Sequence, residues 1–141
     1  MESCEISIII PVYNEEDNLP LLIEGLAGAM AKLTLPYEII AVDDGSGDMS
    51  LQVLKQLSAK FTCLRIIKFT HNCGQSAAFT AGFRLASGSI IVTMDADLQY
   101  DPEDISRLLA KLDKYDMVCG WRKNRHDPWL KLFSTKVANS V

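Results

Sequence analysis

Residues 6–12, ISIIIPV, are apolar on both faces of an extended chain and rich in β-branched side chains. This pattern is typical of a strand buried within a parallel sheet. Three later stretches are also strand-like: YEIIAVDD (37–44), CLRIIKF (63–69) and SIIVTMD (89–95). DMVCGW (116–121) predicts a fifth strand. The chain therefore carries the strands of one buried sheet.

Helical patterns alternate with these strands. Asp17 or Asn18 can cap the first helix, and Pro20 is tolerated in its first turn. Its apolar positions share one side: Leu19, Leu22, Ile23, Leu26, Met30 and Leu33. The later helical patterns are a segment with Leu51, Leu54 and Leu57, a helix of about 75–86 with small residues at Ala77, Ala78, Ala81 and Gly82, a helix starting at 101–104 (DPED), and a segment from Pro128. Strict alternation predicts an α/β fold with a mostly parallel sheet, helices on both faces and right-handed crossovers.

Length and composition fit one compact domain, with 141 residues of which 48% are hydrophobic. The apolar stretches are far shorter than the roughly 20 residues that span a bilayer. Four cysteines lack CxxC spacing, which disfavours a structural zinc site and favours reduced thiols in the cytoplasm. Residues 116–141 hold 2 acids and 5 bases in a chain of net charge −4. This basic end indicates either a local anionic partner, rather than nucleic acid, or ordinary solvated helix charges.

Polar residues follow every predicted strand, at the edge of a parallel sheet where ligands bind. They are YNEE (13–16), DDGS (43–46), HNCGQ (71–75), DADLQ (95–99) and GWR (120–122). Each alone is compatible with a helix cap or a turn. The usual glycine-rich phosphate loops are missing from the sequence. Asp95 and Asp97 are hard oxygen ligands suited to Mg²⁺ or Mn²⁺, and such an ion can hold a diphosphate.

Five motifs carry a family resemblance: SIIIPVYNEEDNL (7–19), AVDDGSGD (41–48), GQSAAFTAGF (74–83), DADLQYDPEDI (95–105) and GWRKNR (120–125). In order and spacing, over nearly the whole chain, they resemble family 2 inverting glycosyltransferases with the Rossmann-like GT-A fold. Within that family they look most like the polyprenyl-phosphate hexosyltransferases, the branch of dolichol-phosphate mannose synthase. The resemblance implies transfer of a hexose from a GDP- or UDP-linked donor to undecaprenyl or dolichyl phosphate, with inversion and with Mg²⁺ or Mn²⁺.

The resemblance also implies roles for single residues. The base and ribose would be bordered by Pro11, Tyr13, Asn14 and Glu15, and contacted by Asp43, with Asp44 supporting the turn. Gln75 would lie near the sugar or diphosphate. Asp95 and Asp97 would bring in the metal, and Gln99 would complete its surroundings. Arg122 and Arg125 would contact phosphate. The resemblance also implies that the catalytic residues would be Asp97, Gln99 and Arg122.

The chain stops inside its last helical pattern. We therefore expect residues 1–141 to be the nucleotide-sugar-binding domain of a longer protein, truncated before its acceptor and membrane region. The segment from Trp129 fits either an interfacial helix at a membrane surface or an amphipathic helix that completes the core. In the full-length protein the expected location is the cytoplasmic face of a membrane.

Two other functions remain open at this stage, and a third is disfavoured by the sequence. One is a transferase of the same fold that acts on a saccharide or protein hydroxyl, for which Asp97 could serve as base. A second is a fragment that binds nucleotide sugar without turnover. The third, a phosphoacceptor receiver module, needs a lysine after its last strand, where this chain has Gly120, Trp121 and Arg122. The donor base, sugar, lipid, choice of metal and oligomeric state are not determined by the sequence.

Overall fold

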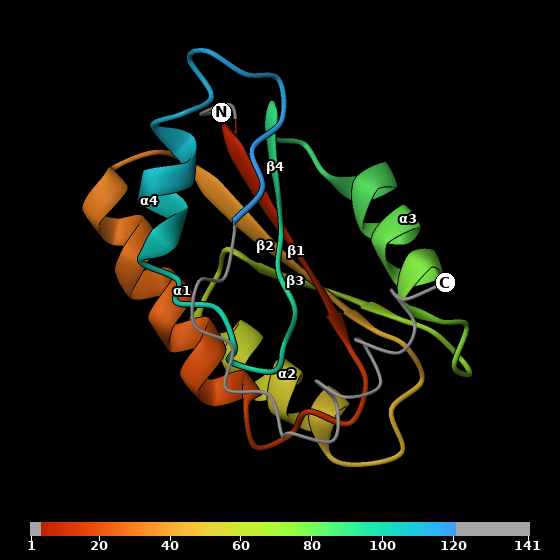
Figure 1. Ribbon diagram of the computed structural model, residues 1–141. Helices are drawn as coiled ribbons and strands as arrows, with labels where there is room; N and C mark the ends of the chain where they lie inside the picture. The colour runs from red at the N-terminus through yellow and green to blue at the C-terminus, as the bar shows by residue number, and fades with distance from the viewer. Residues whose placement is uncertain (1–3, 121–141) are drawn as a thin grey trace, which may run out of the picture.

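The computed structural model describes residues 4–120, and within them a four-stranded parallel sheet has the order β3-β2-β1-β4. The predicted α/β class is confirmed. Strands and helices alternate along the chain (Figure 1): β1 (Ile6–Val12), α1 (Leu19–Leu33), β2 (Tyr37–Asp43), α2 (Ser50–Lys60), β3 (Leu64–Lys68), α3 (Gln75–Leu85), β4 (Ile90–Thr93) and α4 (Asp104–Leu109).

The core lies around the two central strands, β1 and β2, which pair from Ile6 opposite Tyr37 to Val12 opposite Asp43. Alternate residues of β1 face the two sides of the sheet. Ile8 and Ile10 belong to the larger apolar cluster, with α1 and α2, while Ile9 belongs to a smaller one beneath α3. Helices therefore cover both faces, with α1, α2 and α4 on one side and α3 on the other (Figure 1).

The predicted helical stripe of α1 is confirmed, because its first five apolar positions are buried and Leu33 packs against them. Asn18 occupies the N-cap position without a side-chain capping bond. Its Nδ2 instead donates to Glu15 Oε2 at 2.7 Å. The predicted close approach of α3 is also confirmed. A Cβ on Gly82 would lie 2.3 Å from Cγ2 of Ile9, so only glycine fits between α3 and β1.

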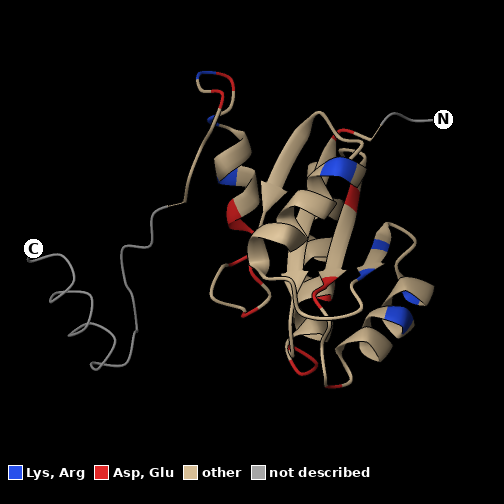
Figure 2. Cartoon of the chain, turned by 90° about the vertical axis from the view of Figure 1, so that its right-hand side faces the viewer, with Lys and Arg blue, Asp and Glu red and all other residues tan. Residues whose placement is uncertain are grey.

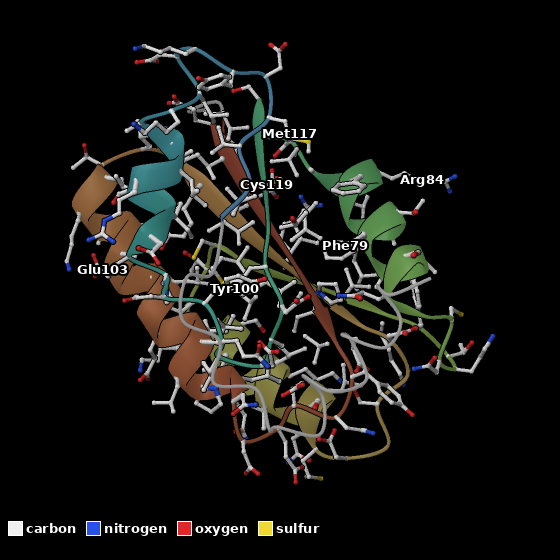
Figure 3. The ribbon with its side chains drawn as sticks, viewed as in Figure 1. Phe79, Arg84, Tyr100, Glu103, Met117 and Cys119 are labelled. Atoms are coloured by element: carbon white, nitrogen blue, oxygen red, sulfur yellow. The ribbon has the colours of Figure 1, made fainter. Side chains whose placement is uncertain are left out.

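The predicted fifth strand is wrong for residues 116–120, which form no strand, and Trp121 lies outside the described residues. Met117 is 78% exposed, so this segment lacks the buried face that stabilises a strand. Figure 3 labels Met117 and Cys119, which are both exposed. The last helical pattern, from Pro128, also lies outside the described residues.

Helix α4 begins at Asp104, three residues later than the first residue of the predicted start at 101–104. The Asp101 carboxylate accepts from the backbone N–H of Glu103 at 3.0 Å and so caps the turn before the helix. Glu103, which is labelled in Figure 3, also pairs with Lys32 of α1 at 2.5 Å, and this contact ties the start of α4 to α1. No helix within residues 4–120 is both long enough and apolar enough to cross a membrane.

Candidate active site

A cleft of about 400 Å³ opens at the carboxyl ends of the strands. It is lined by Pro11, Val12, Tyr13, Glu15, Asp44, Asn72, Gly74, Gln75, Asp95, Ala96 and Asp97. These residues come from the ends of β1, β2 and β4 and from the loop that enters α3. Figure 2 shows acidic positions recurring in the loops at this end of the sheet. The cleft therefore forms at the edge of the sheet where the sequence predicted a binding site.

Two acids of the cleft follow β4 on alternate residues. Met94 extends the pairing with β1 through its N–H to Ile9 O at 3.1 Å. Asp95 and Asp97 then flank Ala96, which is only 4% exposed. Both carboxylates line the cleft, together with the buried alanine between them.

The loop then turns sharply after Asp97. Leu98 has a left-handed φ of 57°, and the N–H of Gln99 donates to Asp97 Oδ1 at 3.1 Å. Gln99 is not among the residues that line the cleft. Its backbone N–H contacts Asp97, and its expected part in the surroundings of the metal stays a prediction.

Gln75, the first residue of α3, faces the loop after β4 that holds Asp95 and Asp97, which we call the acidic loop. Its Nε2 donates to Asp95 Oδ1 at 2.7 Å. The two residues lie 20 positions apart in the sequence, and each follows a different strand. This contact joins the entry of α3 to the loop after β4.

Asp44 and Asp43 are both buried but make different contacts. Asp44 Oδ1 accepts from the N–H of Cys73 at 2.7 Å, and its Oδ2 accepts from the N–H of Gly74 at 2.9 Å. Asp43 Oδ1 accepts from the N–H of Ser46 at 3.2 Å, within its own turn. Asp44 lines the cleft, whereas Asp43 does not. The structure thus places the second acid of the pair, not the first, at the cleft.

The loops after β1 and β2 are bonded to each other. The N–H of Asn14 donates to Ser46 Oγ at 3.1 Å, and Asn14 Oδ1 accepts from the N–H of Gly47 at 2.9 Å. Asn14 adopts a left-handed φ of 56°, and it does not line the cleft. The N–H of Glu15 donates to Ser50 Oγ at 2.8 Å. Asn14 therefore connects two loops beside the cleft.

The structure brings together most of the residues that the sequence singled out. Those at the cleft are Pro11, Tyr13, Glu15, Asp44, Gln75, Asp95 and Asp97. Asn14, Asp43 and Gln99 lie beside it, and Arg122 and Arg125 lie outside the described residues. The sequence predicted no role for Val12 and Ala96, because their side chains are apolar. Asn72 was noted only as part of the polar stretch after the third strand, and Gly74 was noted there and as the first residue of the motif at 74–83.

The residues of the cleft fit a divalent cation that takes part of its coordination from a substrate. Within residues 4–120, no group of three or more His, Cys, Asp or Glu side chains is placed to hold a metal ion. Asp95 and Asp97 line one cleft and offer carboxylate oxygens. Mg²⁺ is commonly held by one or two carboxylates together with substrate phosphates and water. The donor set is therefore of the kind that binds Mg²⁺ or Mn²⁺ together with a diphosphate.

Comparison with known families gives a match to the model of glycosyl transferase family 2 over residues 7–137. The chain belongs to this family. It is 42% identical over 139 residues to an undecaprenyl-phosphate 4-deoxy-4-formamido-L-arabinose transferase of Serratia proteamaculans (strain 568). The match covers 97% of this chain and 43% of that transferase, so this chain spans less than half of the relative's length.

Two solved structures share the fold. The mannosyltransferase PcManGT of Pyrobaculum calidifontis, solved in complex with GDP-Man and Mn²⁺, gives a TM-score of 0.64 at 24% identity over 84% of this chain and 36% of its own. S. aureus TarS 1–349, solved in complex with UDP, gives 0.63 at 24% identity over 88% of this chain and 38% of its own. These likenesses confirm the GT-A-like fold of this glycosyltransferase family member.

Proposed function

We propose that this chain is the nucleotide-sugar-binding part of an enzyme that transfers a sugar to polyprenyl phosphate with inversion. The observation that carries the proposal is that Asp95 and Asp97 line one cleft together with Pro11, Tyr13 and Glu15. One cleft thus contains both the positions that the family implies for the nucleotide and the two acids that suit a cation. The identity of 42% to an undecaprenyl-phosphate sugar transferase supports the choice of acceptor.

The donor would lie across the carboxyl ends of β1 and β4. Its base and ribose would contact Pro11, Tyr13 and Glu15, while its diphosphate would lie toward Asp95 and Asp97. A divalent ion held by these two carboxylates would supply Lewis-acid stabilisation of the leaving nucleoside diphosphate, an effect worth several kcal/mol. Two uncompensated carboxylates would repel a diphosphate, so donor binding and metal binding are expected to depend on each other.

The acceptor requires no dedicated general base. A phosphate monoester has a second pKa of about 6, so at neutral pH it is mostly a dianion and already nucleophilic. Attack on the side of the anomeric carbon opposite to the leaving diphosphate would invert that centre. Arg122 and Arg125 are the residues we assign to phosphate binding, because the planar guanidinium group suits a phosphate monoester. The lipid acceptor would place the reaction at the cytoplasmic face of a membrane.

The direct test is transfer of radiolabelled sugar into an organic-extractable product. The protein is incubated with Mn²⁺ and a panel of UDP- and GDP-linked sugars, with undecaprenyl phosphate as acceptor and a soluble oligosaccharide as its comparison. We expect extractable label only with the lipid phosphate. Label in the oligosaccharide alone would instead establish a transferase that acts on hydroxyl groups. If donor binds but neither product forms, these 141 residues bind nucleotide sugar without turnover.

A further inference from the structure

We propose that Asp44 is a positioning residue that, by holding Gln75 against Asp95, sets the affinity of the cleft for its divalent cation. The inference rests on the proposed function and goes beyond it. The family resemblance implied that Asp44 supports the turn beside the nucleotide. In the structure, two successive sets of hydrogen bonds lead from Asp44 to the loop that holds Asp95 and Asp97.

The first set fixes the loop between β3 and α3. Asp44 is 3% exposed, and each of its carboxylate oxygens already accepts a backbone N–H, from Cys73 and from Gly74. Hydrogen bonds to a charged, buried group are among the strong ones in proteins. With both oxygens engaged in this way, the side chain is better suited to holding the loop than to binding a ligand.

A second contact holds the same loop independently. Gly45 has a φ of +70°, and a Cβ at this position would lie 2.5 Å from the carbonyl carbon of His71 and 2.7 Å from the backbone nitrogen of Asn72. The turn after β2 therefore packs directly on the backbone of the loop. Asp44 and Gly45 together fix the segment that immediately precedes Gln75.

The second set of hydrogen bonds runs from Gln75 to Asp95. Gln75 is an exposed, rotamer-rich side chain, and its amide donates to Asp95 Oδ1 at 2.7 Å. The amide is neutral, so it orients the carboxylate without cancelling the negative charge that attracts a cation. Lysine or arginine at this position would also donate a hydrogen bond, but would compete with the metal. Glutamine therefore meets both requirements.

Metal ligands depend strongly on the groups that orient them, and loss of such a partner typically weakens metal affinity by about 10- to 100-fold. We expect Gln75→Leu, which keeps the bulk and removes the donor, to weaken Mn²⁺ binding by about 10-fold. Asp44→Asn should have a similar effect, because its amide nitrogen cannot accept the second backbone N–H. Gln75→Lys should abolish Mn²⁺ binding although it keeps a donor.

The experiment is a titration of Mn²⁺ into the protein with a nucleoside diphosphate, followed by the electron paramagnetic resonance signal of free Mn²⁺. Gln75→Leu, Asp44→Asn and the double variant are compared with the wild type. Ser76→Ala is the matched control, because Ser76 is exposed on the same turn of α3 and does not line the cleft. Melting temperatures without ligand are recorded in parallel, since a merely structural role would change them and leave the affinity of the folded protein unaltered.

The double variant tests whether the contacts of Asp44 act on the metal site through the contact of Gln75 with Asp95, that is, in series. If Asp44 acts through Gln75, removing both should weaken Mn²⁺ binding no more than the worse single change does, because coupled residues are not additive. Additive losses would overturn the proposed series, and so would wild-type affinity in Gln75→Leu. Should Asp44→Asn fail to fold, Gln75→Leu and Gln75→Lys still test the orienting contact.

Failure of this inference can be distinguished from failure of the proposed function. If the wild type shows no Mn²⁺-dependent binding of any nucleoside diphosphate, the proposed function fails, and the inference fails with it. If the wild type binds both and Gln75→Leu binds them equally well, only the positioning role is overturned.

Discussion

The central strands, β1 and β2, and one of the two edge strands of the described sheet, β4, contribute differently to the same cleft. β1 and β2 are almost completely buried and pair over seven residues each, and the loops that follow them are bonded to each other and to the loop before α3. β4 pairs over only four residues, and Ile91 on it is 42% exposed. The acids assigned to the metal follow this less buried strand.

This difference indicates that one side of the cleft depends on the folding of the core and the other on local contacts between loops. The side of the cleft assigned to the nucleotide directly follows the buried central strands, although Tyr13 on it is 50% exposed, so the folding of these strands fixes where its loops begin. The side assigned to the metal depends on local contacts, among them Gln75 to Asp95 and the N–H of Gln99 to Asp97. Substitutions in the centre should therefore unfold the protein, whereas substitutions at the edge should mainly alter binding.

The largest contrast is expected between two isoleucines of neighbouring strands. Ile10 is fully buried in β1, and Ile10→Ala should lower the free energy of unfolding by about 2–5 kcal/mol through lost burial and a cavity. Ile91→Ala, on exposed β4, should cost less than about 1 kcal/mol. Urea denaturation of both variants measures the difference. Equal losses would contradict the division between centre and edge.

A second large effect is expected at the opposite end of the sheet, where Glu38 ties the entry of β4 to β2. The Glu38 carboxylate accepts from Ser7 Oγ, from the N–H and Oγ of Ser87, and from Arg65. Burial by itself raises the pKa of Glu38, but these hydrogen bonds lower the pKa from 4.5 to about 2. A carboxylate with a lowered pKa stabilises the fold above its ordinary pKa, and this contribution is lost as the pH falls.

The contribution of Glu38 should be on the order of 3 kcal/mol at neutral pH. It should disappear as the pH falls from 4.5 to about 2. Urea unfolding of the wild type and Glu38→Gln across this range checks the sign, because the gap between them should narrow toward low pH. Hydrogen bonds also lower the pKa of Asp48, against the effect of burial. Because Asp48 is present in both the wild type and Glu38→Gln, it does not contribute to the difference between them. A gap that stays constant with pH would refute the assignment.

A smaller loss of stability is expected where the turn after β2 packs on the loop between β3 and α3. Gly45→Ala introduces a Cβ against the backbone of His71 at a positive φ, and overpacking of this kind costs about 1–3 kcal/mol. Gly28→Ala is the matched control, because a Cβ there meets nothing within 4 Å. In α1 this change should stabilise by about 0.5–1 kcal/mol. Thermal unfolding compares the two, and a neutral Gly45→Ala would show that the loops are not held together there.

The smallest effect belongs to the ion pair between α1 and α4. Lys32 and Glu103 contact each other at 2.5 Å, but their side chains are 67% and 53% exposed. A double-mutant cycle with Lys32→Ala and Glu103→Ala should give a coupling of about 0.2–1 kcal/mol, reduced by salt. A coupling above about 2 kcal/mol would mean that α4 is fixed more firmly than an exposed ion pair allows.

Much of the fold was predictable because burial leaves a strong pattern in the sequence. The apolar run at 6–12 coincides with β1, and the helical spacing from Leu19 to Leu33 coincides with α1. Residues 116–120 of the predicted strand form no strand, because an apolar composition does not specify what covers it. A strand needs a partner and a buried face, and Met117 has no such cover among the described residues.

The candidate site was predictable as a region but not contact by contact. Polar residues after parallel strands had to meet at one edge, so seven of the eleven residues that line the cleft could be expected there from their positions. Which of Asp43 and Asp44 faces the cleft depends on how the chain turns after β2, which the sequence does not specify. The contact of Gln75 with Asp95 joins two separate loops, so it follows from tertiary packing rather than from any local pattern.

Asp95→Asn tests the central claim most directly, in a thermal-unfolding experiment with UDP or GDP in the presence and absence of Mn²⁺. We predict that one nucleotide raises the melting temperature of the wild type only when Mn²⁺ is present, since a ligand at about 100 times its Kd stabilises a protein by about 2.7 kcal/mol. Asp95→Asn should lose this rise while melting like the wild type without ligand. Equal stabilisation in the variant, or stabilisation of the wild type without metal, would contradict the account.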